Sequence, residues 1–72
     1  MVEVFKTNVT ARRQARLLLA QIHATFAQYR ANFDLEDCDR VLRVESRHGL
    51  ISPACLIELL QKAGFQAEVL PD

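Results

Sequence analysis

The stretch Val9–Gln28 reads VTARRQARLLLAQIHATFAQ and decides the fold, because it predicts one long helix. Its apolar residues recur at the i, i+3, i+4 and i+7 spacing that places side chains on one face of a helix. Thr10 is the expected N-cap, since its hydroxyl can accept a hydrogen bond from a free backbone N–H. We therefore expect a helix that starts at Thr10 and ends at Gln28 or Tyr29, with the rest of the chain covering its apolar side. That apolar stripe comprises Ala15, Leu18, Leu19, Ile22 and Phe26.

Four short segments around this helix have the composition of β-strands. Residues 2–8 are rich in valine and phenylalanine, and residues 31–36 and 41–45 alternate apolar with polar side chains. The turn-like tripeptide Asp37-Cys38-Asp39 separates the last two segments, which together predict a hairpin. Residues 65–70 predict a fourth strand.

A second helix is predicted between Ser52 and Gly64. Ser52 can cap its first turn, Pro53 suits the first helical position, and Gly64 suits a left-handed stop. Glu58 and Lys62 have the i, i+4 spacing of a favourable ion pair on a helix surface. The apolar stripe of this helix comprises Leu56, Leu59, Leu60 and Ala63.

The order of these elements is β-α-β-β-α-β, which predicts the α+β class and a ferredoxin-like sandwich. Two right-handed crossovers bring the four antiparallel strands into the order 4-1-3-2, with both helices on one face of the sheet. We expect a single domain over residues 1–72, without linkers or repeats.

Composition narrows the functional classes. The chain has no net charge at pH 7, so it lacks the basic footprint of a nucleic-acid binder. The N-terminal residues MVEVFK do not resemble a signal peptide, and no apolar run reaches the roughly 20 residues of a membrane span. Two cysteines in such a chain indicate free thiols and a cytoplasmic location. A neutral, half-apolar chain also favours self-association, so a homodimer is one expectation.

With this order of elements, the chain resembles a heavy-metal-associated domain, the family of copper chaperones and of the metal-binding modules of copper-pumping ATPases. The similarity covers almost the whole chain. Three segments carry it: the start FKTNV at residues 5–9, the strand DRVLRVE at residues 39–45, and the ending LQKAGFQAEV at residues 60–69. Members often close with Lys-Ala-Gly-Tyr or Lys-Ala-Gly-Phe before the last strand.

The family binds its metal through a Cys-x-x-Cys pair at the first turn of the first helix, where two thiolates suit a soft ion such as Cu(I). Those cysteines are absent from this sequence. Thr10 and Arg13 occupy the two positions in one register, and Ala11 and Gln14 occupy them in the other. Neither register supplies a sulfur ligand, so no metal site and no cofactor are expected there.

The three arginines of the first helix admit two interpretations. Arg12, Arg13 and Arg16 could form a site for an anion or an acidic partner at a helix N-terminus. Alternatively, the acidic residues of the 34–39 hairpin could neutralise Arg12 and Arg13, because the predicted topology puts the hairpin and the start of the helix at one end of the domain. Phe65 matches a position near the metal loop of the family, so it joins the arginines as a candidate partner-binding residue.

The cysteines give a weaker signal. Cys38 lies between Asp37 and Asp39, whose charges disfavour a thiolate, so an ordinary hairpin cysteine is expected. Cys55 is expected at the other end of the domain, packed as a small hydrophobic residue, which excludes an internal disulfide. The alternative function is residual copper or zinc binding through Cys38 and neighbouring carboxylates, or between two chains.

An enzymatic alternative is also open. Acylphosphatases share the ferredoxin-like fold and use an arginine and an asparagine at a phosphate-binding loop, to which Asn8 and Arg12 invite comparison. The loop contains no glycine, however, and no nucleophile–base pair is visible. His23 and His48 have no partner at metal-ligand spacing and are expected to be surface residues.

The leading hypothesis is therefore a non-enzymatic, cytoplasmic protein-interaction module on a metal-domain scaffold that has lost its metal site. Its partner would be an unknown protein, with neither nucleic acid nor membrane involved.

Overall fold

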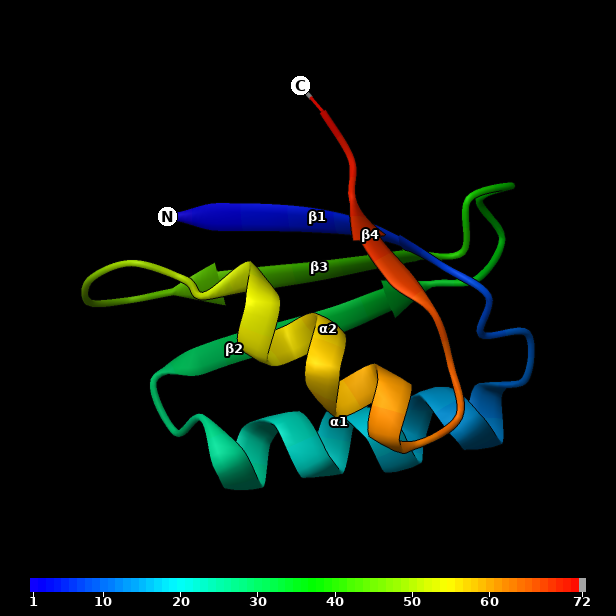
Figure 1. Ribbon diagram of the computed structural model, residues 1–72, viewed down its shortest axis with the longest axis horizontal. Coiled ribbons are helices and arrows are strands. Elements are labelled where there is room, and N and C mark those ends of the chain that lie inside the picture. Colours follow the sequence, from blue (N-terminus) through cyan, green and yellow to red (C-terminus); the bar gives the residue numbers. More distant parts are fainter. Residues whose placement is uncertain (72) are drawn as a thin grey trace.

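The computed structural model describes residues 1–71 and shows an α+β fold of four strands and two helices (Figure 1). The chain order is β-α-β-β-α-β, as predicted. The elements are β1 (Val2–Thr7), α1 (Arg12–Thr25), β2 (Tyr29–Asp34), β3 (Val41–Ser46), α2 (Pro53–Lys62) and β4 (Ala67–Val69).

The strands form one antiparallel sheet in the order β2-β3-β1-β4, which reads 4-1-3-2 when counted from the β4 edge. In the register, Leu42 of β3 lies opposite both Phe5 of β1 and Phe33 of β2. Because side chains alternate along a strand, these residues share one face of the sheet. The opposite face carries exposed residues such as Arg30 and Arg43.

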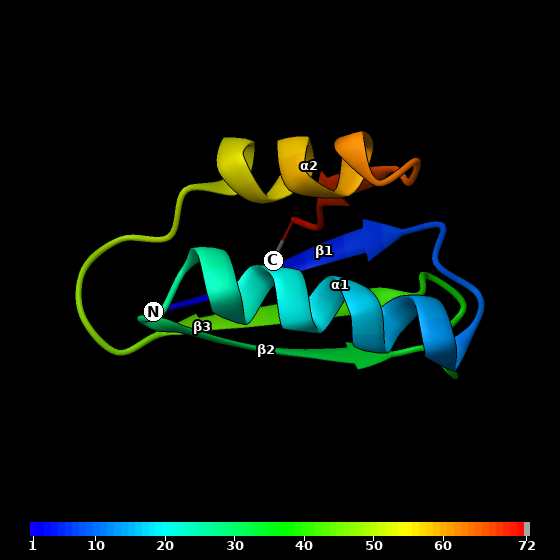
Figure 2. The ribbon, with the colours of Figure 1, turned by 90° about the horizontal axis from the view of Figure 1, so that it is seen from below.

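Both helices contribute to a single core with that inner face. Figure 2 shows α1 crossing in front of the strands, with α2 beside it. Residues of α1, α2 and the inner sheet face belong to one contiguous buried cluster, which confirms the two apolar stripes in outline. The largest fully buried side chains are Phe5, Val9, Leu18, Ile22, Leu42, Val44, Leu56 and Leu60.

The ends of α1 differ from the prediction. Thr10 is not the N-cap: the cap residue is Ala11, which has no side-chain acceptor. The amide oxygen of Gln14 accepts from the Ala11 N–H at 3.4 Å, which supplies half of a capping box. The helix ends at Thr25 because Phe26 leaves helical geometry, and the Tyr29 N–H then donates to the Phe26 carbonyl at 3.0 Å. This turn starts β2 two residues earlier than predicted.

The ends of α2 confirm the prediction. The Ser52 hydroxyl accepts from the Cys55 N–H at 3.4 Å, and Pro53 is the first helical residue. Gly64 adopts φ = 93°, and a Schellman motif follows, in which the Phe65 N–H donates to the Leu60 carbonyl at 2.9 Å.

Three further details of α2 and β4 can be compared with the prediction. Ala63 is exposed rather than part of the buried stripe, because it is the C-cap residue, where the chain already turns away. Glu58 and Lys62 form the expected ion pair at 3.1 Å. The last strand covers only residues 67–69 of the predicted 65–70, since residues 63–66 are taken up by the turn that ends α2.

Candidate functional site

Hydrogen bonds tie three loops together at the end of the domain where α1 begins. The Thr7 N–H donates to the Asp39 carbonyl at 3.0 Å, and the Thr7 hydroxyl donates to the Arg40 carbonyl at 2.6 Å. Asn8 and Gln66 are joined twice: the Asn8 N–H donates to the Gln66 carbonyl at 3.3 Å, and the Gln66 N–H donates to the Asn8 side chain at 2.8 Å. The loop before α1, the 35–40 turn and the turn after α2 therefore form one connected end.

Most backbone N–H groups of the loop that leads into α1 are already bonded within the protein. Val9 is fully buried, and its N–H donates to the Thr7 hydroxyl at 3.3 Å. With the bonds described above, the N–H groups of Thr7, Asn8, Val9 and Ala11 all donate within the protein. A phosphate-binding loop needs such N–H groups to be free. The geometry therefore offers little for the phosphate chemistry that Asn8 and Arg12 suggested.

The positions compared with Cys-x-x-Cys carry no set of metal ligands. Thr10 and Arg13, the first register, are both exposed at the start of α1. Ala11 and Gln14, the second register, are the N-cap and third residue of α1 and are bonded to each other. The second pair is thus joined across the first turn by an amide hydrogen bond.

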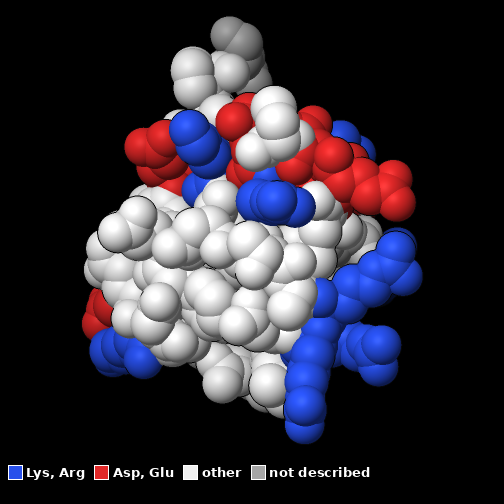
Figure 3. Space-filling model, turned by 90° about the vertical axis from the view of Figure 1, so that its right-hand side faces the viewer, with Lys and Arg blue, Asp and Glu red and all other residues white. Residues whose placement is uncertain are grey.

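The three arginines of α1 are exposed, and no acidic residue lies in the first turn of the helix. Figure 3 faces this end of the molecule: acidic side chains with some basic ones among them line the upper part, further basic side chains gather at the lower right, and an uncharged surface fills the middle. Within residues 1–71 the only side-chain ion pairs are Lys6–Asp39 at 4.0 Å and Glu58–Lys62 at 3.1 Å. The 34–39 hairpin thus forms no direct ion pair with Arg12, Arg13 or Arg16.

A groove of about 570 Å³ separates α1 from the end of β2. Arg12 and Arg16 line its helical side, and Asp34 and Glu36 line the side of β2 and the following turn. Apolar Leu19, Phe33 and Leu35 also line it. The groove therefore has a basic side, an acidic side and an apolar component, which suits a peptide segment better than a small anion.

The structure does not place Arg13 or Phe65 in this groove. Arg13 is exposed on α1 outside the groove lining. Phe65 is half-buried and packs against the core, directly after the Schellman turn. The four predicted residues thus form a pair in the groove, a neighbouring exposed arginine, and an aromatic residue engaged mainly in packing.

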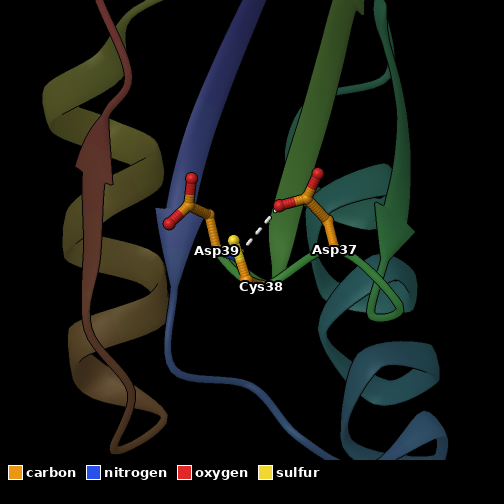
Figure 4. A group of neighbouring side chains, drawn as sticks. All are labelled: Asp37, Cys38 and Asp39. Carbon is orange, nitrogen blue, oxygen red and sulfur yellow. Dashed lines mark hydrogen bonds between the residues drawn. The ribbon is translucent and has the colours of Figure 1, made fainter.

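Cys38 lies in the turn between β2 and β3, exposed between two carboxylates (Figure 4). Ligand atoms of Asp37, Cys38 and Asp39 lie within 4.8 Å of one another. One Asp37 oxygen already accepts from the Asp39 N–H at 2.9 Å, as expected of a tight turn. A soft sulfur combined with two hard carboxylates matches neither the thiolate set that holds Cu(I) nor the oxygen set that holds Ca²⁺.

Cys55 is exposed, so the expectation that it packs as a small hydrophobic residue was wrong. The first turn of α2 directs it toward a groove of about 700 Å³ between the two helices, which Phe26 and Leu59 also line. Both cysteines are free thiols, as predicted.

His23 has a role that sequence reasoning missed. Its Nε2 accepts a hydrogen bond from the Ala31 N–H of β2 at 3.1 Å. The residue is exposed and lies in the last turn of α1, beside the outermost strand of the sheet. The only sequence signal for this contact is that His23 lies eight residues before Ala31, across a helix-to-strand turn.

No protein-family model matches the chain, and no curated protein matches it either. Among residues 1–71, no helix is both long enough and apolar enough to cross a membrane.

Proposed function

We propose that this protein is a non-enzymatic interaction module with a ferredoxin-like fold, which binds an acidic segment of a partner protein through Arg12, Arg13 and Arg16. The observation that carries the proposal is that these three arginines are exposed and have no ion-pair partner within residues 1–71, although four acidic residues lie in the hairpin at the same end. Unpaired positive charge at a helix N-terminus destabilises the helix, so its presence there favours a functional explanation.

The scaffold in this proposal is that of a heavy-metal-associated domain without its metal site. The strand order and the α+β architecture are compatible with that fold. The two candidate ligand pairs, Thr10/Arg13 and Ala11/Gln14, provide no sulfur, and an arginine repels a cation. The interaction surface of the module would therefore occupy the end where relatives of this architecture hold their ion.

The groove beside α1 indicates how a partner segment would be held. The carboxylates of the partner segment would pair with Arg12 and Arg16, and one of its apolar side chains would cover Leu19 and Phe33. Asp34 and Glu36 on the other side would select against a segment that is acidic throughout. The preferred partner is thus a peptide with acidic residues on one side and an apolar or basic residue on the other.

The test is binding of a fluorescent peptide with the sequence pattern Glu-Glu-Leu-Lys, repeated twice, measured by anisotropy at low and physiological salt. The Arg12→Glu/Arg13→Glu variant is expected to lose at least tenfold in affinity, about 1.4 kcal/mol. Arg43→Glu/Arg47→Glu is the matched control, because it makes the same charge change on exposed residues outside the groove. Equal binding by both variants would exclude the arginine end as the interface.

The alternative function, residual metal binding through Cys38, has one observation in its favour: the close ligand atoms of Asp37, Cys38 and Asp39. An anaerobic titration of the reduced protein with Cu(I) and Zn(II), against a competing chelator, distinguishes the two proposals. The interaction module predicts no stoichiometric binding. Tight binding that disappears in Cys38→Ser would establish the metal function instead.

A further inference from the structure

Strand β2 lies at the edge of the sheet, and its outward-facing backbone groups can be identified from the pairing. Ser46 exchanges hydrogen bonds with Met1: its N–H donates to the Met1 carbonyl at 2.9 Å, and the Met1 amino group donates to the Ser46 carbonyl at 3.2 Å. The backbone N–H and C=O of Ser46 therefore point toward β1, away from Tyr29, its partner on β2. The direction of the backbone N–H and C=O groups alternates along an antiparallel strand. Those of Tyr29, Ala31 and Phe33 therefore point away from β3, toward the free edge of the sheet.

Some of these outward groups have partners within the chain. The Tyr29 N–H donates to the Phe26 carbonyl at 3.0 Å, and the Ala31 N–H donates to His23 Nε2 at 3.1 Å. Among residues 1–71, nothing pairs with the Phe33 N–H or with the carbonyls of Ala31 and Phe33. The edge is therefore open from residue 31 to residue 33, except where the His23 imidazole occupies it. Exposed strand edges commonly carry such a protecting group.

We infer that the β2 edge is a self-pairing surface: two copies of this chain join antiparallel about a two-fold axis at Asn32, and the His23 imidazole keeps the surface closed. In this register the backbone of Ala31 in one copy pairs with the backbone of Phe33 in the other. The two-fold axis generates this pair twice, once on each side of Asn32. The outward groups of these residues have the direction that this pairing requires. The two four-stranded sheets would then form one continuous sheet.

Charge and size both select this register. On the exposed face, Arg30 of one copy lies opposite Asp34 of the other, so two opposite-charge pairs flank the axis. On the inner face, the small Ala31 lies opposite the half-buried Phe33, whose ring lines the groove beside α1. A shift that centres the axis on Ala31 puts Arg30 opposite Asn32 and loses both charge pairs. A shift that centres it on Phe33 opposes two phenylalanines and matches Arg30 with Glu36, which lies beyond the end of β2.

The occupant is a second copy because the edge is complementary to itself. Basic Arg30 and acidic Asp34 lie at equal distance along the strand from Asn32, on the same exposed face. A two-fold axis turns that arrangement into matched pairs, as an isologous interface requires. The open edge is short, so the dimer buries little surface, and we expect a dissociation constant on the order of 100 μM once His23 is removed.

This surface shares Phe33 and Asp34 with the groove of the proposed function, but it does not involve the three arginines, and the variants that test the two proposals are different. The experiment is sedimentation equilibrium of the full chain at about 0.5 mM, above the expected dissociation constant. His23→Ala is expected to approach twice the monomer mass of 8.2 kDa. His23→Gln, which keeps an acceptor for the Ala31 N–H, and His48→Ala, which removes the other histidine, are the matched controls and should stay near the monomer mass.

Charge reversal then tests the register in the His23→Ala background. Asp34→Arg places two arginines opposite each other and is expected to weaken the dimer at least tenfold, whereas adding Arg30→Asp restores it. Circular dichroism of each variant verifies that the fold is retained. A folded His23→Ala protein that remains monomeric overturns the inference, and so does a dimer whose mass is unchanged by Asp34→Arg.

Discussion

The amide oxygen of Gln14 accepts a hydrogen bond from the backbone N–H of Ala11, 3.4 Å away, across the first turn of α1. This bond stabilises a helix start that has neither a side-chain cap at its N-cap residue nor an acidic residue in its first turn. The three exposed arginines next to it remain free of ion pairs within residues 1–71. The helix start is therefore held by one neutral amide while its positive charge stays available to a partner.

Replacing Gln14 with glutamate is expected to stabilise the protein. The carboxylate keeps the acceptor for the Ala11 N–H and adds a negative charge where the helix dipole is positive. The free energy of unfolding should rise by about 0.5 kcal/mol in urea denaturation. The same variant should weaken binding of the acidic peptide, because the new charge lies beside the arginines. A loss of stability would show that Gln14 does not cap α1 as described.

Asn8→Ala is expected to loosen the connection between the loop before α1 and the turn after α2. The Asn8 side chain is the acceptor for the Gln66 N–H at 2.8 Å, so its removal should cost about 1 kcal/mol. Hydrogen exchange at the Gln66 amide should accelerate with it. Asn32→Ala, at an exposed position on the outer sheet face, is the control and should leave that amide unchanged.

Gly64→Ala is expected to destabilise the protein by roughly 1 kcal/mol, because φ = 93° is a backbone conformation that residues with a Cβ disfavour. Apart from Gly64 and its two chain neighbours, no atom of residues 1–71 lies within 4 Å of the position where the Cβ would be placed, so the loss arises from the backbone alone. Thermal unfolding measures the difference. Gly64→Asn should lose less than Gly64→Ala, since asparagine tolerates the left-handed region better. An alanine variant as stable as the parent would contradict the Schellman assignment.

Leu56→Ala is expected to remove much of the stability of this small domain. Leu56 is fully buried, and such truncations cost about 2–5 kcal/mol through lost burial and the cavity left behind. Domains of this size have modest stability, so a partly unfolded variant is expected in urea titrations. Leu50→Ala is the matched control: its side chain is 79% exposed, and its removal should change stability by less than about 0.5 kcal/mol.

Much of the fold could be predicted from the sequence because it depends on local patterns. The stripes around Leu18 and Leu56 follow helical periodicity, and the Ser52 cap and Gly64 stop follow from the chemistry of single residues. The start of α1 could not be predicted in this way. Thr10 has the better capping side chain, but the bonds that Thr7 and Asn8 make to other loops delay the helix to Arg12.

The site was less predictable, because its decisive features are contacts between distant elements. The sequence predicted that the start of the first helix shares one end of the domain with the acidic hairpin, and the groove confirms this, since Arg12 and Arg16 line it together with Asp34 and Glu36. Whether opposite charges would pair directly depends on side-chain reach, which residue spacing does not determine. The bond between His23 and Ala31 depends on how α1 lies across the sheet edge, so His23 was expected to be an ordinary surface residue.

The central claim is that the start of α1 is an interaction surface for an acidic segment. Its most direct test is a two-dimensional NMR titration of the isotope-labelled protein with the Glu-Glu-Leu-Lys repeat peptide. Saturable shifts concentrated at residues 12–19 and 33–36, the two sides of the groove, are the predicted result. Shifts confined to other surfaces, or no shifts at millimolar peptide, would contradict the account.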